Sequence, residues 1–345
     1  MSAEGEAAAR VRVLPEQVSR KIAAGEVIDR PYSVVRELID NALDAEASHI
    51  EAHLEAGGTR SIRVVDDGSG MTREDLELCF LPHATSKIEN ESDLEEVSSL
   101  GFRGEALSSI GTVARLRITS ATDDSGNGNR LVVDGGRKVS LGPAPANRGT
   151  TVEVSDLFYS LPARKRFLKR PSAETRMGST TFTEKALPFP QVTFRLFTDG
   201  ELKLFLPADD LEGRVLAAHP DLGSKRMLHR VEGSGEAFSF VVVTPGLELV
   251  RRDRKRLQIY VNGRRVWEYA LVQAVEYAFS DYIPGGLHPT AFVFLDVDPH
   301  EVDFNIHPAK REARFRNLKD IHARLTRSLK DFLKADLGAA TARGD

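Results

Sequence analysis

The chain has 345 residues, of which 41% are hydrophobic and 28% charged, and its formal net charge is −4 at pH 7. This length predicts two domains, and the composition is ordinary for a soluble globular protein. No apolar run approaches the roughly 18 residues that cross a bilayer, and the N-terminus lacks the apolar core of a secretory signal. The single cysteine, Cys79, can form neither an intrachain disulfide nor a zinc site alone. We therefore expect a soluble protein of a reducing compartment, the cytoplasm, that is neither membrane-bound nor secreted.

The first half of the chain predicts helices followed by strands. Helical periodicity runs from Pro15 to Ala45 and is clearest from Ser33, where apolar residues recur at i, i+1, i+4, i+5, i+8 and i+9. Residues 71–100 are polar with few apolar repeats, and such long segments are usually functional or mobile. Residues 101–111 predict a glycine-rich entry into a short helix. Strand-like alternation is found in five segments: His49–Glu55, Ser61–Val65, Arg115–Ala121, Gly128–Asp134 and Thr150–Val154.

The second half predicts a separate domain. A boundary is expected at Asp199–Gly213, which holds Gly200, Pro207 and a small acidic cluster. Beyond it we expect three strands and two helices: Phe238–Thr244, Leu257–Val261 and Thr290–Asp296, then Trp267–Tyr282 and Lys319–Leu337. Together these elements predict an α+β architecture of two layers in two domains.

Two polar patterns in the first half could serve a nucleotide. Glu37 and Asn41 lie four residues apart on one helical face, where a carboxylate can accept a proton from water and an amide oxygen can hold Mg²⁺. Asp66 ends a strand and is followed by glycines up to Gly70, so its carboxylate could accept from the exocyclic amine of adenine. Taken singly, the first is more often a solvated helix face and the second an ordinary turn.

Two further patterns involve glycine and the start of a helix or strand. Residues 101–107 (GFRGEAL) place glycines before a helix N-terminus, which favours an anion. Residues 147–151 (NRGTT) form a turn into a strand that is uninformative by itself. The chain has no P-loop and no Rossmann fingerprint, so a nucleotide site must be built in another way.

In this order and at these separations, the four patterns resemble the Bergerat-fold (GHKL) ATPases, which include type II topoisomerase subunits, heat-shock chaperones, sensor histidine kinases and MutL proteins. Longer strings resemble the ATPase portion of MutL mismatch-repair proteins: residues 24–31 (AGEVIDRP), 83–87 (HATSK), 100–107 (LGFRGEAL), 156–168 (DLFYSLPARKRFL) and 302–310 (VDFNIHPAK). The resemblance spans residues 13–332. It implies a two-layer α/β sandwich with the Bergerat ATPase fold, followed by a smaller α/β domain resembling ribosomal protein S5 domain 2.

The resemblance also implies a domain layout. Residues 1–12 match a flexible arm, 13–208 an ATPase domain, 209–337 a transducer-like domain, and 338–345 a tail. Within the ATPase domain, residues 71–104 match a mobile lid over the nucleotide. Two positions depart from the family pattern, because Asp67 stands where Asn is common and Asp40 stands where Glu is common.

Roles for individual residues follow from the same resemblance. Glu37 matches the general base, Asn41 the Mg²⁺ ligand and Asp66 the residue that reads adenine. Lys310 matches a lysine of the second domain that reaches the γ-phosphate of ATP. The remaining ATP contacts that the resemblance implies are Gly70, Thr85, Ser86, Lys87, Gly101, Phe102, Arg103, Gly104, Glu105, Ala106, Leu107 and Thr150.

Basic residues gather in the second half of an otherwise acidic chain. Charge alone usually means a solvated face, but the family resemblance implies contact with DNA phosphates that is weakly sequence-specific and salt-dependent. The cluster comprises Arg251, Arg252, Arg254, Lys255, Arg256, Arg264 and Arg265.

The family resemblance implies a slow, DNA-stimulated ATPase that acts as a matchmaker in DNA mismatch repair. It implies an ATP-dependent homodimer, a MutS-type mismatch-recognition partner and downstream repair enzymes, and a nucleoid-associated location if the source is bacterial. We expect no endonuclease site in this chain. Two alternatives stay open: a nucleotide-gated interaction module with negligible hydrolysis, and another GHKL ATPase such as a topoisomerase subunit.

Overall fold

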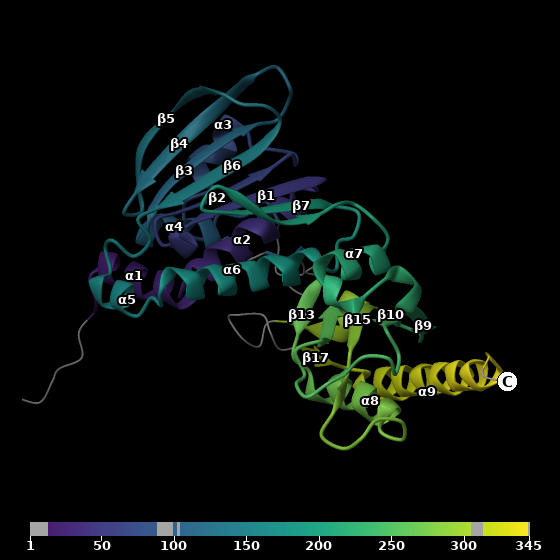
Figure 1. Ribbon diagram of the computed structural model, residues 1–345. Helices are drawn as coiled ribbons and strands as arrows, with labels where there is room; N and C mark the ends of the chain where they lie inside the picture. The colour runs from purple at the N-terminus through teal and green to yellow at the C-terminus, as the bar shows by residue number, and fades with distance from the viewer. Residues whose placement is uncertain (1–12, 88–98, 102–103, 305–312, 344–345) are drawn as a thin grey trace, which may run out of the picture.

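The computed structural model describes residues 13–87, 99–101, 104–304 and 313–343, with side chains described up to Leu337. Within these ranges an eight-stranded sheet and a five-stranded sheet are each covered by helices (Figure 1). The predicted α+β, two-layer fold class is therefore confirmed. No helix in the described part of the chain is long and apolar enough to cross a membrane.

The predicted helical run at the start of the chain is two helices, α1 (Glu16–Val27) and α2 (Pro31–Asp44). The break falls before Pro31 because proline disfavours a helical conformation in the residue that precedes it. Arg30 is accordingly extended, with φ −151° and ψ 169°. Proline then suits the first position of α2, where a backbone N–H would have no partner within the helix.

The first sheet has the strand order β5-β4-β3-β6-β2-β1-β7-β8, and only β1 and β7 are parallel neighbours. Its strands are β1 (His49–Glu55), β2 (Ser61–Asp66), β3 (Arg115–Ala121), β4 (Asn127–Asp134), β5 (Arg137–Pro145), β6 (Gly149–Ser155), β7 (Thr193–Thr198) and β8 (Glu201–Leu206). Burial alternates along the strands, so that Ile50, Ala52 and Leu54 of β1 face the core. Helices lie over this buried face, α2 and α6 (Pro171–Ala186) among them, while the other face is open (Figure 1).

Several elements of the first sheet's layer have weak sequence signals. The short helix α3 (Arg73–Leu78) lies in the polar segment expected to lack structure, and a reciprocal capping box of Thr72 and Asp75 starts it. Helix α6 has few large apolar residues, yet it buries four positions spaced by four: Glu174, Gly178, Phe182 and Ala186. The remaining helices of this layer are α4 (Ala106–Val113) and α5 (Pro162–Arg166).

The second sheet has the strand order β13-β12-β15-β10-β9. These strands are β9 (His229–Ser234), β10 (Phe238–Thr244), β12 (Leu257–Val261), β13 (Arg264–Val266) and β15 (Ala291–Val297). Two short pairs accompany it: β11 (Val250–Arg251) with β14 (His288–Pro289), and β16 (Val302–Asp303) with β17 (Arg314–Phe315). Helices α8 (Tyr269–Phe279) and α9 (Leu318–Arg343) supply its core with apolar residues such as Leu271, Val275, Leu325 and Leu329.

Helix α7 (Leu211–Ala218) lies between the two sheets (Figure 1). Its Arg214 is completely buried, and the guanidinium donates to four backbone carbonyls: those of Ala186, Pro190, Val192 and Pro207. A small apolar cluster, which includes Leu187, Val215 and Phe292, joins the two main cores. The arginine therefore holds the end of the first sheet's layer against the start of the second.

We expect the substitution Arg214→Met to lower the free energy of unfolding by about 3 kcal/mol, because several buried carbonyls would lose a charged donor. Urea unfolding measures this. Arg226→Met is the matched control, because Arg226 is exposed and its loss should change the free energy by less than about 0.5 kcal/mol. Equal unfolding midpoints for the two variants would contradict this role of Arg214.

Candidate functional site

Helix α2 carries the first group of candidate residues on one face. Glu37 has a side chain that is 13% exposed, and its Oε1 accepts from Arg36 Nε at 3.0 Å. Asn41 lies one turn further along and places Oδ1 3.4 Å from Lys87 Nζ. Asp44 follows on the same face, since positions 37, 41 and 44 have the spacing i, i+4, i+7. The apolar residues on the opposite side of α2 pack on the sheet and set this orientation.

Asp44 is a candidate site residue that the sequence analysis missed, although its spacing on the helical face of Glu37 and Asn41 was the available signal. Its side chain is 8% exposed and accepts from three donors. These donors are the amide of Leu100 at 2.8 Å, the amide of Gly101 at 2.9 Å and Lys87 Nζ at 2.6 Å. Two positions far apart in the expected lid are thus attached to α2 at a single carboxylate.

The oxygen atoms of Asn41 and Asp44 suit a hard cation. Lys87 places its ammonium between them, so the pair already accepts a positive charge at that point. Mg²⁺ prefers such oxygen ligands and usually takes only one or two from the protein when phosphates supply others. Among the described residues, no group of three or more His, Cys, Asp or Glu side chains could hold a metal ion by itself. Asn41 therefore fits the role of a ligand shared with phosphates.

Asp66 stands at the end of β2, opposite Thr150 of β6. Its Oδ1 accepts from the Gly68 amide at 3.0 Å. Burial is the main influence on this carboxyl and raises its pKa to about 6, against the lowering effect of hydrogen bonds to backbone groups. Ser120 of β3 lies beside them, with its Oγ 2.9 Å from Thr150 Oγ1. The same Oγ accepts a hydrogen bond from the amide of Met71 at 2.8 Å. The structure thus gathers Asp66 and Thr150 and adds Ser120.

Gly70 occupies a position that only glycine fits. Its φ is +71°, and a Cβ there would lie 2.0 Å from the carbonyl oxygen of Ala121. The chain therefore passes close against the end of β3 next to Asp66.

The two departures from the family pattern have structural roles. Asp67 accepts from the amides of Ser48 and His49, each at 2.8 Å, and so fastens the start of β1. Burial tends to raise the pKa of Asp67, but the hydrogen bonds from Ser48 and His49 outweigh it and lower the pKa to about 2. Asp40 accepts from Lys185 Nζ of α6 at 2.6 Å.

Residues 101–107, which are expected to receive the phosphates and are called the phosphate cradle here, begin beside Asp44 and end in α4. A Cβ on Gly101 would lie 3.6 Å from Asn41 Oδ1 and from Asp44 Oδ2. Gly104 has φ +59° and lies against the backbone of Ala84, whose carbonyl a Cβ would approach to 2.6 Å. Glu105, Ala106 and Leu107 form the start of α4, where no side-chain cap hydrogen bond is made. Phe102, Arg103 and Lys310 lie outside the described residues.

Two further predicted residues belong to the lid. Thr85 Oγ1 accepts from the amide of Lys87 at 3.2 Å, which helps to set the direction of the lysine. Ser86 is exposed.

The structure corrects the prediction that Arg264 contacts DNA. Arg264 is only 4% exposed, and its guanidinium donates to the Ser99 carbonyl at 2.5 Å, so it offers no exposed charge to a phosphate. Four other members of the basic cluster are paired with acids: Arg251 with Asp253, Arg254 with Glu276, Arg256 with Asp221, and Arg265 with Glu184.

Arg252 and Lys255 are exposed members of the basic cluster, and no ion pair of Arg252 is found among the described residues. Lys255 has a side chain that is 83% exposed and is 3.6 Å from Asp253. The net positive charge around these residues is therefore smaller than the sequence alone indicates, because acids from other segments lie beside Arg254, Arg256 and Arg265.

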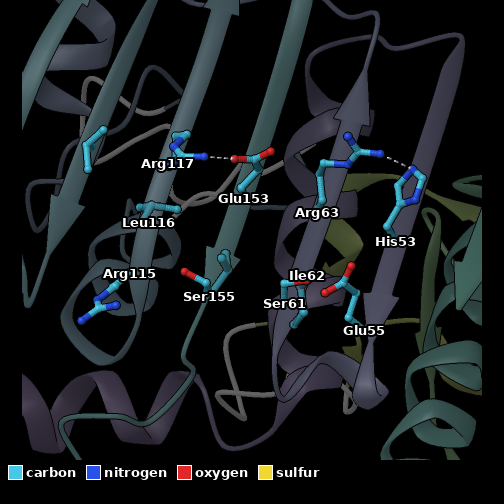
Figure 2. Close-up of a pocket in the computed structure, with 12 residues that line it drawn as sticks. His53, Glu55, Ser61, Ile62, Arg63, Arg115, Leu116, Arg117, Glu153 and Ser155 are labelled. Atoms are coloured by element: carbon cyan, nitrogen blue, oxygen red, sulfur yellow. Dashed lines mark hydrogen bonds and ion pairs between the residues drawn. The ribbon is translucent and has the colours of Figure 1, made fainter. Parts of the chain in front are cut away.

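A hollow of about 640 Å³ lies on the open face of the first sheet, away from α2 (Figure 2). Charged residues line it, but they are paired across strands. Arg117 lies 2.8 Å from Glu153, and Arg63 donates to His53 at 3.0 Å. None of the candidate nucleotide residues lines this hollow.

Comparison with known proteins gives two matches to protein families. Residues 30–140 match the family described as histidine kinase-, DNA gyrase B-, and HSP90-like ATPase. Residues 223–334 match the family described as DNA mismatch repair protein, C-terminal domain. The first match contains Glu37, Asn41, Asp66 and Gly101, and with the sandwich fold it defines the class of this protein, a GHKL-type ATPase domain joined to a second α/β domain.

Similar proteins narrow the assignment. The chain is 42% identical over 336 residues to the DNA mismatch repair protein MutL of Bradyrhizobium diazoefficiens, covering 96% of this chain and 55% of that protein. It is 41% identical to MutL of Treponema pallidum, covering 93% of this chain and 54% of that protein. The chain thus spans about half the length of the curated relatives it matches. It belongs to the MutL family of DNA mismatch repair proteins.

Solved structures share the fold. The structure described as the N-terminal domain of a DNA repair protein has a TM-score of 0.76 and 25% identity, covering 92% of this chain and 98% of that one. The Aquifex aeolicus MutL ATPase domain complexed with ADP has a TM-score of 0.61 and 24% identity, covering 87% of this chain and 98% of that one.

The raised pKa of Asp66 predicts a pH-dependent cost in stability. A carboxyl whose pKa is raised on folding stabilises the protein below pH 4, and this contribution is lost as the pH rises through about 6. We expect Asp66→Asn to be more stable than the wild type at pH 7.5, by about 1–3 kcal/mol, with the difference vanishing near pH 4. Urea unfolding across this pH range measures it. A constant difference would show that Asp66 does not titrate in this range.

Proposed function

We propose that this chain binds ATP with Mg²⁺, hydrolyses it slowly, and acts through its nucleotide state as a switch in DNA mismatch repair. The observation that carries the proposal is the arrangement on α2. Glu37, Asn41 and Asp44 share one helical face, and the segments expected to cover a nucleotide are fastened to it. Membership of the MutL family and the match to an ATPase family support it.

In this proposal Asp66 selects the base. A buried carboxylate at the end of β2 is costly, and a ligand that donates an N–H to it would recover that cost. The exocyclic amine of adenine is such a donor, whereas guanine carries an oxygen at the same edge. Thr150 and Gly70 would form the adjoining walls.

Asn41 would hold Mg²⁺, which when bound offsets the negative charge of the phosphates. Lys87 Nζ, now 3.4 Å from Asn41 Oδ1, would have to give up that contact to a bound ion. The backbone at Gly101, Gly104 and the start of α4 would receive the phosphate oxygens, because helix N-termini attract anions. Phe102, Arg103, Thr85 and Ser86 remain proposed contacts.

Glu37 would accept a proton from the attacking water. Its Oε1 is engaged by Arg36, and the hydrogen bonds among the described residues leave Oε2 without a donor. A general base of this kind supplies roughly 10²–10⁴-fold in rate. Lys310 is proposed to reach the γ-phosphate from the second domain, so that the two domains respond to ATP and ADP differently.

The whole protein is proposed to act as a matchmaker. ATP would favour a homodimer through the N-terminal arm and the lid, and the dimer would bind DNA and engage a MutS-type protein and downstream repair enzymes. These partners are proposed from the family. A cytoplasmic location suits a chain with one cysteine.

A second candidate is a nucleotide-gated interaction module in which hydrolysis is incidental. The contact between Lys87 and the Asn41–Asp44 pair favours it, because a resident cation there would compete with Mg²⁺.

Steady-state ATP hydrolysis distinguishes the two candidates. We expect slow turnover that single-stranded DNA stimulates, and at least a 100-fold lower rate for Glu37→Ala with unchanged affinity for a non-hydrolysable analogue. Glu236→Ala, at an exposed position in the turn between β9 and β10, is the control and should keep the wild-type rate. Equal residual rates in the wild type and Glu37→Ala would favour the interaction module.

DNA binding is proposed to use the exposed basic residues. We expect the double change Arg252→Glu and Lys255→Glu to lower affinity for DNA about tenfold at low salt, and to make its salt dependence shallower, because phosphate contacts release counterions. ATP affinity should not change. The charge-matched control is Arg60→Glu with Lys203→Glu, of which Arg60 directly precedes β2 and Lys203 lies in β8. Equal losses in both double variants would mean that net charge, and not this patch, determines binding.

A further inference from the structure

Arg264 of β13 is an unusual residue for the second sheet, because it is buried and its charged end contacts the other half of the chain. It is 4% exposed, and its Nη2 donates to the carbonyl of Ser99 at 2.5 Å and lies 3.5 Å from the carbonyl of Leu100. Ser99 and Leu100 are more than 160 positions away in the sequence and directly precede the expected phosphate cradle. The sequence predicted that this arginine contacts DNA, and its burial excludes that role. Its contact with the backbone of the lid therefore needs another explanation.

The same two peptide groups are held from their other side by Asp44. The peptide that joins Ser99 to Leu100 offers its carbonyl to Arg264 and its N–H to Asp44 Oδ1 at 2.8 Å. The next peptide offers its carbonyl to Arg264 and its N–H, on Gly101, to Asp44 Oδ2 at 2.9 Å. Two consecutive peptide dipoles thus lie between a guanidinium and a carboxylate, with each end facing the charge that stabilises it. We call these two peptides and their charged partners the Arg264–Asp44 clamp.

The surroundings of Arg264 keep its side chain in place. The guanidinium carbon lies 4.3 Å from the ring centroid of Phe304, within range of a cation–π contact. Burial lowers the pKa of Arg264, while the negative charges of Asp40 and Asp44 oppose that effect. Arg264 Nε finds no hydrogen-bond partner among the described residues. The two lid carbonyls are therefore the principal hydrogen-bond acceptors that the described part of the chain gives this buried cation.

We propose that Arg264 is a positioning residue through which the second domain sets the entrance of the phosphate cradle, by holding the Ser99–Gly101 backbone against Asp44. The inference rests on the proposed ATP site and deepens it. Asp44 alone fixes the N–H side of these peptides, but a loop held on one side can still rotate about its own axis. With both sides held, Gly101 is kept beside Asn41, where the phosphates and Mg²⁺ would bind. Preorganisation of this kind raises ligand affinity, because less ordering is needed on binding.

The test compares Arg264→Met with Arg264→Lys. Methionine keeps an unbranched apolar chain against Phe304 and removes the donors, so the Leu100 and Gly101 amides should exchange hydrogen at least about tenfold faster. Lysine keeps the charge but lacks the planar fork, and should restore part of the protection. Arg324→Met is the control, since Arg324 lies in helix α9 of the second half of the chain and also donates to a backbone carbonyl, that of Ser234 in β9, at 3.0 Å.

Nucleotide binding gives the second measurement. With Mg²⁺ and a non-hydrolysable ATP analogue, Arg264→Met should bind about tenfold more weakly, which is about 1.4 kcal/mol, while kcat at saturating ATP changes less than about threefold. The effects of Arg264→Met and Asp44→Asn should not add in the double variant, because both act through the same two peptides.

Each outcome has a distinct meaning. Wild-type exchange and affinity in Arg264→Met, or full additivity with Asp44→Asn, would overturn the clamp. Faster exchange in Arg324→Met as well would assign the effect to general stability and also overturn it. If the wild-type protein binds no ATP analogue, the proposed function fails, and the exchange measurement still decides whether the clamp holds the lid. If Arg264→Met does not fold, Arg264→Lys provides the same comparison.

Discussion

The arrangement of the proposed nucleotide site depends on one carboxylate, that of Asp44 at the end of α2. It accepts from Lys87 and from the amides of Leu100 and Gly101, so it joins the start and the end of the expected lid to the helix that carries Glu37 and Asn41. A carboxylate with an 8% exposed side chain needs such donors, because a buried charge without partners is costly. The charge and the lid therefore hold each other in place.

The second half of the chain reaches this carboxylate through Arg264. In a buried setting, an arginine costs free energy unless polar groups surround it, and here the carbonyls of Ser99 and Leu100 supply them. Arg214 is likewise buried between the two halves of the chain, and its charge is stabilised by carbonyls at the end of the first sheet's layer. Two buried arginines on backbone carbonyls thus help to join the two halves, beside the apolar cluster that includes Leu187, Val215 and Phe292. A nucleotide that moves the lid would act on this boundary directly.

At Asp66, an arrangement that suits ligand recognition lowers the stability of the fold. Its raised pKa means that the folded protein without a ligand bears a cost at neutral pH, and the neighbouring Gly70 places the backbone where no side chain fits. Such features are expected where a site is built to receive a partner rather than to stabilise the fold. Asp67, the next residue, has a pKa lowered to about 2 and does the opposite, because its hydrogen bonds serve β1 alone.

The sequence by itself determined the elements with strong periodicity and the residues that form local motifs. Strands β1, β3, β10 and β12 have the predicted bounds, and Glu37 and Asn41 share a face because a helix brings i and i+4 together. Helix α6 and the pairing of the basic cluster were decided only by the tertiary structure. The helix buries Glu174, Gly178 and Ala186 beside a single large apolar residue, Phe182, so it shows little apolar periodicity. Arginines of the basic cluster meet acids or carbonyls distant in sequence, as Arg254 meets Glu276. Arg264 shows why the sequence was not sufficient. A charged residue among other charged residues is predicted to be exposed, and only the packing of a segment distant in sequence shows that it is buried.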